Sequence, residues 1–206
     1  IIKNIKIMAC LLSLGRKEPC KDVVGGIKSI YFVNFGDLGT VTEVDDEITG
    51  KKVDVNQFHG NENSYLKLIN GGRKIKYTFN HKARYTNDIN YEIYGTLGQG
   101  EDGTSKKIKH VMPYKHRNHI FKDKYFKLIE DKPSRTITAH LKMDCHSHIH
   151  PRQVRSITPR EAARIQSFPD DYVFLGAYLK TYMQIGNAVP PVMARGIAKV
   201  LNKHIK

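Results

Sequence analysis

The side chains best suited to chemistry in this sequence are cysteines and a run of histidines. The run C-H-S-H-I-H occupies residues 145–150, and thiolate and imidazole groups are common zinc ligands. In an extended strand, His146, His148 and His150 would lie on one face. A single row of three ligands does not form a tetrahedral cage, and the sequence has no C-x-x-C spacing. We therefore expect no metal site.

The cysteines also bear on the cellular compartment. Cys10, Cys20 and Cys145 cannot all pair within one chain, so a disulfide scaffold is not indicated. The mildly apolar segment 1–14 contains two lysines and is shorter than the roughly 20 apolar residues of a membrane span. We expect a cytoplasmic protein with no membrane or targeting segment. Because the first residue is Ile1 rather than methionine, the sequence suggests a fragment or a start out of its natural context.

The charge distribution favours an anionic partner. The chain has 34 Lys and Arg residues against 20 Asp and Glu residues, a formal net charge of +14. Residues 1–80 carry 12 basic and 9 acidic side chains, whereas residues 81–206 carry 22 and 11. Such an excess attracts polyanions without specifying a sequence. DNA, RNA and an anionic membrane surface all remain compatible with it.

Two C-terminal helices are expected to position the candidate functional residues. Thr158 can cap the first helix, Pro159 fits its first turn, and Glu161 completes a T-x-x-E capping box. The string Q-I-G-N-A-V-P-P, a Gly-Asn turn followed by two prolines, precedes the second helix. That helix should run to about Lys203 and dock one apolar face on a sheet.

Short strands and one further helix are expected before these two helices. Their signals are β-branched and aromatic runs separated by glycine and aspartate. The expected strands are Ser29–Phe35, Thr40–Val44, Lys52–Val55, Thr136–Leu141 and His146–His150, and the expected helix is Asn87–Leu97.

The break Asn70-Gly71-Gly72 separates two regions of different composition. We expect a small β-rich N-terminal region of uncertain origin over residues 1–72. A second region over residues 80–206 would combine a mixed part with the two C-terminal helices. The predicted fold class is therefore α+β. A complete doubly wound, Rossmann-like catalytic domain would need more parallel strand and helix units than this sequence supplies.

Three strings between Arg135 and Pro191 carry a family resemblance. They are R-T-I-T-A-H, S-I-T-P-R-E-A-A-R-I-Q-S-F-P-D and Y-M-Q-I-G-N-A-V-P-P, in that order. They resemble the C-terminal part of the cytosine-5 DNA methyltransferases, above all the last two sequence blocks. The resemblance covers about residues 80–206 and implies a target-recognition region followed by C-terminal helices.

The resemblance assigns roles to residues in both blocks. In the family, the ninth block braces the target-recognition region, which makes Arg160 and Glu161 structural candidates. The tenth block folds back onto the catalytic domain, and its Gly-Asn segment lines the S-adenosylmethionine pocket. Asn187, Ala188 and Val189 are therefore the cofactor-side candidates, and they would form only part of that site.

The resemblance also implies double-stranded DNA as a partner. In D-K-P-S-R-T-I-T-A-H, Thr136 and Ile137 match the positions at which family members present a threonine and an aliphatic residue to DNA disrupted by a flipped cytosine. On local signals alone, T-I-T is equally a β-strand, and the histidine-rich strand would lie beside the DNA. Phosphate contacts are expected from Lys122, Lys124, Lys127, Lys132 and Arg135.

The catalytic groups of the family are not found intact. Methylation of cytosine carbon 5 needs a thiolate, a carboxylic acid and a methyl donor, which the family supplies from Phe-x-Gly-x-Gly, Pro-Cys-Gln and Glu-Asn-Val segments. Here Cys20 is followed by Lys21, and Glu62 lies in a polar N-E-N-S context. We therefore assign no catalytic residue. We expect the chain to be inactive alone and to need a separate catalytic N-terminal half.

Two other interpretations remain open. Residues 8–45 resemble the opening of a phage tail structural protein, which would make the chain a fusion. A non-catalytic DNA-binding module would also explain the basic second region. Beside these stands the leading hypothesis, the DNA-recognition part of a restriction-modification methyltransferase.

Overall fold

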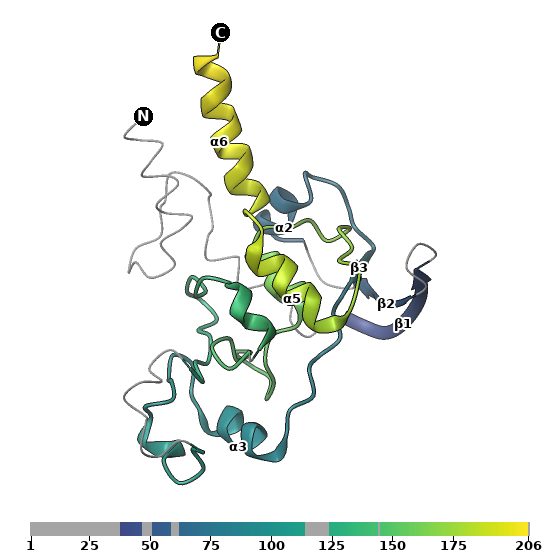
Figure 1. The fold of residues 1–206 in the computed structure, drawn as a ribbon. Helices are drawn as coiled ribbons and strands as arrows, with labels where there is room; N and C mark the ends of the chain where they lie inside the picture. Colours follow the sequence, from purple (N-terminus) through teal and green to yellow (C-terminus); the bar gives the residue numbers. More distant parts are fainter. Residues whose placement is uncertain (1–37, 47–50, 59–61, 114–123, 144, 206) are drawn as a thin grey trace.

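The computed structural model describes residues 38–46, 51–58, 62–113, 124–143 and 145–205 of the chain (Figure 1). In these ranges short helices and a small sheet are joined by long irregular segments. The elements, with η for 3-10 helices, are β1 (Leu38–Asp46), β2 (Lys51–Phe58), α2 (Ser64–Ile69), β3 (Tyr77–Phe79), α3 (Asp88–Thr96), η2 (Lys106–Ile108), η4 (Ala139–Lys142), α4 (Pro159–Ile165), α5 (Tyr178–Asn187) and α6 (Pro191–His204).

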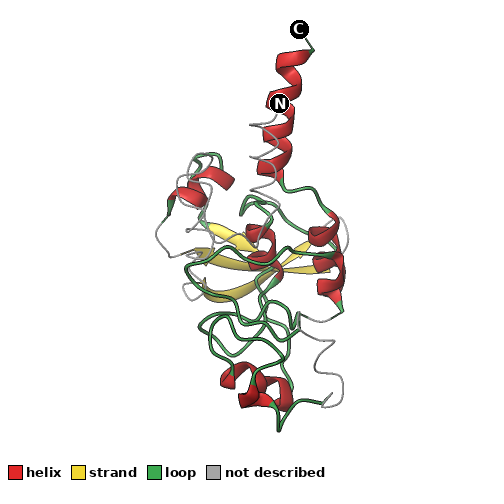
Figure 2. Ribbon diagram, turned by 90° about the vertical axis from the view of Figure 1, so that its left-hand side faces the viewer, coloured by secondary structure: helices red, strands yellow, loops and turns green. Residues whose placement is uncertain are grey.

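The strands form an antiparallel sheet in the order β1-β2-β3, drawn in yellow in Figure 2. Val44 pairs with Val53 between the first two strands, and Val55 pairs with Phe79 between the second and third. The expected strands Thr40–Val44 and Lys52–Val55 are confirmed within β1 and β2. The expected strand at residues 29–35 lies outside the described residues.

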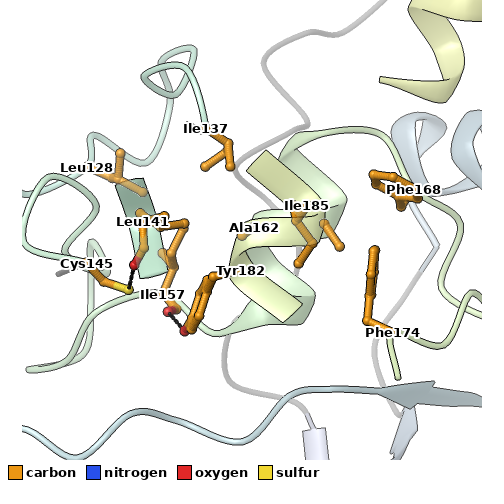
Figure 3. Close-up of a cluster of buried hydrophobic side chains, with 11 residues drawn as sticks. Leu128, Ile137, Leu141, Cys145, Ile157, Ala162, Phe168, Phe174, Tyr182 and Ile185 are labelled. Atoms are coloured by element: carbon orange, nitrogen blue, oxygen red, sulfur yellow. Dashed lines mark hydrogen bonds between the residues drawn. The ribbon is translucent and has the colours of Figure 1, made fainter. Parts of the chain in front are cut away.

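The main hydrophobic core lies where α4, α5 and η4 meet (Figure 3). The helix α5 buries Thr181, Tyr182 and Ile185 on one face, the spacing of an amphipathic helix. Inside the core the Tyr182 hydroxyl donates a hydrogen bond of 2.8 Å to the carbonyl of Ile157. Because burying a hydroxyl without a partner is costly, this bond allows Tyr182 to be fully buried.

The expectation of two C-terminal helices was wrong, because α5 is a third. The sequence Q-I-G-N was interpreted as a turn, whereas it completes the last turns of α5. The expected strand at residues 136–141 is also wrong: its first half is irregular and its second half belongs to η4. Residues 146–150 form a turn with an isolated bridge at Ile149 instead of a strand.

A second, smaller core supports α3. It is formed by Ile93, Tyr94, Leu97, Ile108, Met112, Tyr125 and Ile149. The predicted helix Asn87–Leu97 is confirmed as α3, and Asn87 caps it by accepting a hydrogen bond from the Asn90 N–H. The part of the described chain between β3 and α4 is thus organised around a short helix rather than a sheet.

The segment 64–80 packs against the helix α4 and the loop that follows it. The Tyr65 hydroxyl donates to the carbonyl of Arg164, and the Asn80 side chain bonds both the N–H and the carbonyl of Phe174. The Arg160 N–H donates to the carbonyl of Asn80 at 2.9 Å. Residues on both sides of the interval 72–80, where the sequence suggested a boundary between two regions, therefore pack against the same helix and loop.

The helix α6 extends away from the rest of the described chain (Figures 1 and 2). Its predicted bounds are confirmed closely, since it begins at Pro191 and ends at His204. None of its residues is buried, so the expected docking of its apolar face on a sheet is not seen. Within the described residues, no helix has both the length and the apolar character needed to cross a bilayer.

Candidate functional site

The start of α4 is fixed by a capping box and a buried ion pair. The Thr158 hydroxyl accepts the N–H of Glu161, and the Glu161 carboxylate accepts the N–H of Thr158. Arg155 donates two further hydrogen bonds, of 2.8 and 2.7 Å, to that carboxylate. Burial would raise the pKa of Glu161, but the hydrogen bonds and charge of Arg155 outweigh burial and lower it to about 2.

Arg160 joins three separate segments of backbone. It is fully buried, and its guanidinium donates hydrogen bonds to the carbonyls of Phe79, Pro169 and Tyr172. Five guanidinium N–H groups in a rigid fork suit this task, which a lysine could not perform. The structure thus places both structural candidates, Arg160 and Glu161, inside the packing of α4 and away from solvent.

A second buried ion pair closes the end of the same helix. Arg164 and Asp170 are almost wholly buried and are joined by two hydrogen bonds, of 2.5 and 3.0 Å. The Asn70 side chain donates to the Asp170 carboxylate and accepts the Asp170 N–H. These contacts connect α2 with the F-P-D exit of α4.

The turn after α5 is held in place by the end of α4. The Gln166 side chain donates to the carbonyl of Ile185, and the Ser167 hydroxyl accepts the N–H of Val192. The cofactor-side candidates lie between these two anchors. Asn187 is exposed, Ala188 packs partly against the main core, and the side chain of Val189 is exposed. The turn therefore presents an amide and an apolar side chain to the outside on a fixed backbone.

Gly186 brings this turn against the segment that carries Thr136. A Cβ atom built at Gly186 would lie 2.5 Å from the nitrogen of Ala139 and closer still to the carbonyl group of Thr138. Real Cβ atoms essentially never approach another heavy atom within 3.0 Å. Only glycine allows α5 to come this close to the peptide between Thr138 and Ala139.

The two expected DNA contacts, Thr136 and Ile137, differ in their surroundings. Thr136 is exposed, whereas Ile137 is 3% exposed and belongs to the main core. Next to them, the guanidinium of Arg135 lies 3.8 Å from the ring centre of Phe126, a cation-π arrangement that orients it. In this conformation the Thr136 and Arg135 side chains reach the surface, while Ile137 supports them from inside.

The expected phosphate contacts are distributed unevenly. Lys132 is exposed and Lys124 is partly exposed, so both ammonium groups can reach a polyanion. Lys122 lies outside the described residues. The expectation is wrong for Lys127, which is buried and donates hydrogen bonds of 2.9 and 2.8 Å to the carbonyls of Tyr94 and Leu97. A cation at the C-terminal carbonyls of a helix is favourable, so Lys127 stabilises α3 instead.

The histidines of the 145–150 run point in different directions. His146 stacks on Tyr125 and bonds the Tyr94 hydroxyl, whereas His148 is buried and donates to the carbonyl of Arg135. His150 accepts the N–H groups of Arg152 and Gln153. Burial lowers the pKa of His148 to about 4 and that of His150 to about 3. Within the described ranges, no group of three or more potential ligands could hold a metal ion.

Of the two residues weighed for catalysis, only Glu62 is described. It is partly exposed and precedes α2, whose first turn is capped by the Asn63 side chain. Cys20 lies outside the described residues. Sequence reasoning did not identify Gly186 as a point of close contact, because the Gly-Asn pair was interpreted as a turn and not as the end of a helix.

Comparison with known proteins identifies the family. The family model for C-5 cytosine-specific DNA methylase matches residues 36–203, most of the chain. The chain therefore belongs to the C-5 cytosine-specific DNA methylase family. The match spans all the described strands and helices except His204, the last residue of α6, and it includes residues 36–45 of the segment for which a phage origin was expected.

Individual relatives are type II methyltransferases by name. The chain is 49% identical over 100 residues to a protein assigned as type II methyltransferase M.OihORF3336P of Oceanobacillus iheyensis, covering 48% of this chain and 21% of that protein. It is 39% identical over 136 residues to type II methyltransferase M.Bpa9945I of Bacillus paralicheniformis, covering 61% of this chain and 30% of that protein. The chain thus spans between a fifth and a third of these relatives' lengths.

A solved structure shares the fold. It is a crystal structure of an E. coli protein assigned as a DNA modification methyltransferase encoded within a prophage. The similarity has a TM-score of 0.52 at 20% identity, and it covers 80% of this chain and 44% of the other. The partial coverage of the other chain agrees with the partial coverage of the sequence relatives.

Proposed function

We propose that this chain is the C-terminal, DNA-recognition part of a DNA (cytosine-5)-methyltransferase. It would bind double-stranded DNA and complete the S-adenosylmethionine site, while a catalytic half supplies the thiolate and the carboxylic acid. S-adenosylmethionine, when bound, provides the methyl group. Two observations support this proposal: the chain belongs to the family, and it matches only a fifth to a third of the length of the curated relatives.

On the DNA side, the proposal rests on the surface around Thr136. Arg135, Lys132 and Lys124 would contact phosphates, which gives affinity that falls with salt. The exposed Thr136 would lie at the DNA next to the flipped base, and the buried Ile137 would hold the Thr136 backbone in place.

On the cofactor side, the turn at residues 187–189 offers one wall of a pocket. Its backbone is fixed by Gln166 and Ser167, so the Asn187 amide is presented without much loss of conformational freedom. The residues present fit a partial site, in which Asn187 donates and accepts hydrogen bonds and Val189 contributes apolar contact. The opposite wall would come from the catalytic half.

The observation that carries the proposal is the uncovered C-terminal segment. Val189, Leu201 and Ile205 are 57%, 53% and 78% exposed, and α6 has no buried residue. Large apolar side chains exposed along one protruding segment are what a surface covered by another protein would present. In our proposal the catalytic half covers it, and this brings the fixed turn at Asn187 to the cofactor.

The test is a methylation assay by complementation. The chain is incubated with unmethylated duplex DNA and labelled S-adenosylmethionine, with and without an N-terminal methyltransferase half that carries a Pro-Cys-Gln loop. We expect incorporation only in the mixture. The Asn187→Ala variant should raise the KM for S-adenosylmethionine, and the matched control Asn90→Ala, at a partly exposed position of α3, should not.

Two outcomes would contradict the proposal. Robust incorporation by the chain alone would show that it contains its own catalytic groups. Salt-dependent DNA binding without any gain in methylation, whichever catalytic half is added, would instead support the non-catalytic DNA-binding module.

A further inference from the structure

The contact between Gly186 and the peptide joining Thr138 to Ala139 connects two parts of the site that are distant in sequence. Gly186 precedes Asn187, and Thr138 follows Thr136 by two residues. The contact is between backbones, so neither side can yield by turning a side chain. A shift of the last turn of α5 or the start of η4 toward the other must therefore displace both.

Other helical glycines do not share this constraint. Gly95 is the penultimate residue of α3, just as Gly186 is the penultimate residue of α5. A Cβ atom at Gly95 would meet only the Val154 side chain, at an ordinary distance of 3.8 Å. Glycine weakens a helix relative to alanine. At position 186 the close backbone approach explains why glycine is present despite this loss of helix stability. At position 95 no such close approach exists.

We propose that Gly186 is a positioning residue that sets the placement of the DNA-facing segment at Thr136 relative to the cofactor-side turn at Asn187. DNA bound at the Thr136 segment then further restricts the turn at Asn187, and cofactor bound at that turn further restricts the Thr136 segment. This inference rests on the proposed function, because it requires that Thr136 faces DNA and that Asn187 faces S-adenosylmethionine.

The proposal predicts a particular kinetic signature for Gly186→Ala in the complemented enzyme. The added methyl group must separate α5 from the Thr138 peptide, so both half-sites shift. We expect the KM for DNA and the KM for S-adenosylmethionine each to rise about tenfold or more. Thr136→Ala should raise mainly the KM for DNA, and Asn187→Ala mainly the KM for S-adenosylmethionine. The control Gly95→Ala should leave both KM values within about twofold of the wild-type values.

A purely structural role gives a different result. A variant that only unfolds more easily lowers the rate at saturation, through a smaller active fraction, and leaves both KM values unchanged. That pattern for Gly186→Ala, or a rise in only one KM, would overturn the proposal. A wild-type mixture without activity would instead count against the proposed function.

Hydrogen exchange on the wild-type chain gives a second test that needs neither the variant nor a catalytic half. We expect a bound DNA duplex to slow amide exchange at residues 183–189 as well as at 136–142, and to leave residues 197–205 unchanged. Protection at 136–142 without any change at 183–189 would overturn the coupling, although DNA binding itself would stand. If Gly186→Ala fails to fold, this measurement decides.

Discussion

Arg155 and Glu161 form a two-point ion pair across the first turn of α4, and the same carboxylate accepts the N–H of Thr158. The Glu161 side chain is 2% exposed and that of Arg155 is 13% exposed. The capping box therefore also neutralises a buried charge. The helix α4 therefore begins at a point where three hydrogen bonds converge on one carboxylate.

Replacing this carboxylate should be costly for folding. Glu161→Gln keeps a capping side chain but leaves the largely covered Arg155 guanidinium without its counter-charge. We expect the free energy of unfolding to fall by about 3 kcal/mol. Glu92→Gln, in the exposed pair with His110, should change it by less than about 1 kcal/mol. Urea denaturation of both variants checks this, and equal effects would argue against a special role for the buried pair.

Stability should fall on mild acidification. His148 and His150 have pKa values of about 4 and 3 in the folded chain because burial opposes their charged forms, against 6.5 for the ordinary side chain. A lowered folded pKa gives stability that is fully present above pH 6.5 and is lost as pH falls toward the folded value. Between pH 7 and 5 the loss should reach about 4 kcal/mol for the two groups together.

Denaturation curves at pH 7, 6 and 5 measure this loss. His148→Phe should reduce the pH dependence by about one proton taken up on unfolding. A free energy of unfolding that stays constant from pH 7 to 5 would refute the assignment of neutral, buried imidazoles.

Two neighbouring ion pairs should contribute very differently to the free energy of unfolding. Arg164 and Asp170 are buried, so Arg164→Ala leaves a carboxylate without its partner and should lower the free energy of unfolding by about 3 to 5 kcal/mol. Arg73 pairs with Asp171 at the surface, and Arg73→Ala should cost at most about 1 kcal/mol. Thermal or urea unfolding of the two variants would test the contrast, which similar losses would contradict.

The T-I-T segment should separate into a functional and a structural residue. Thr136→Ala should weaken binding of duplex DNA about fivefold, the loss of roughly one hydrogen bond, with stability nearly unchanged. Ile137→Ala should lower the free energy of unfolding by about 2 to 5 kcal/mol, because it leaves a cavity in the main core. DNA titrations by fluorescence anisotropy, paired with denaturation, distinguish the two. A Thr136→Ala variant that binds DNA normally would remove that residue from the interface.

Local signals predicted the parts of the fold that local interactions determine. The capping box at Thr158, the bounds of α3 and the start of α6 at Pro191 follow from caps and prolines, whose effects act within one turn. The helix α2 also has such a signal, the Asn63 cap, but it is short and lies in a polar context. It was missed because six residues give little periodicity.

Long-range packing determined what the sequence did not reveal. The histidine run was expected to be a strand, yet it forms a turn in which the buried His148 bonds the carbonyl of Arg135. Lys127 resembles any basic surface residue in sequence, but it binds the end of α3. The family resemblance supplied the candidate site residues, which stay predictions, whereas the contact between Gly186 and Thr138 could be found only in the structure.

The protrusion of α6 has a thermodynamic consequence for assembly. A helix of 14 residues that buries none of them is near the limit at which an isolated helix persists in water. Any surface that covers it would therefore select and stabilise its ordered form, so helix formation and association become one equilibrium. Substitutions on the solvent side of α6 that only raise helical propensity should then tighten association, although they touch nothing across the interface.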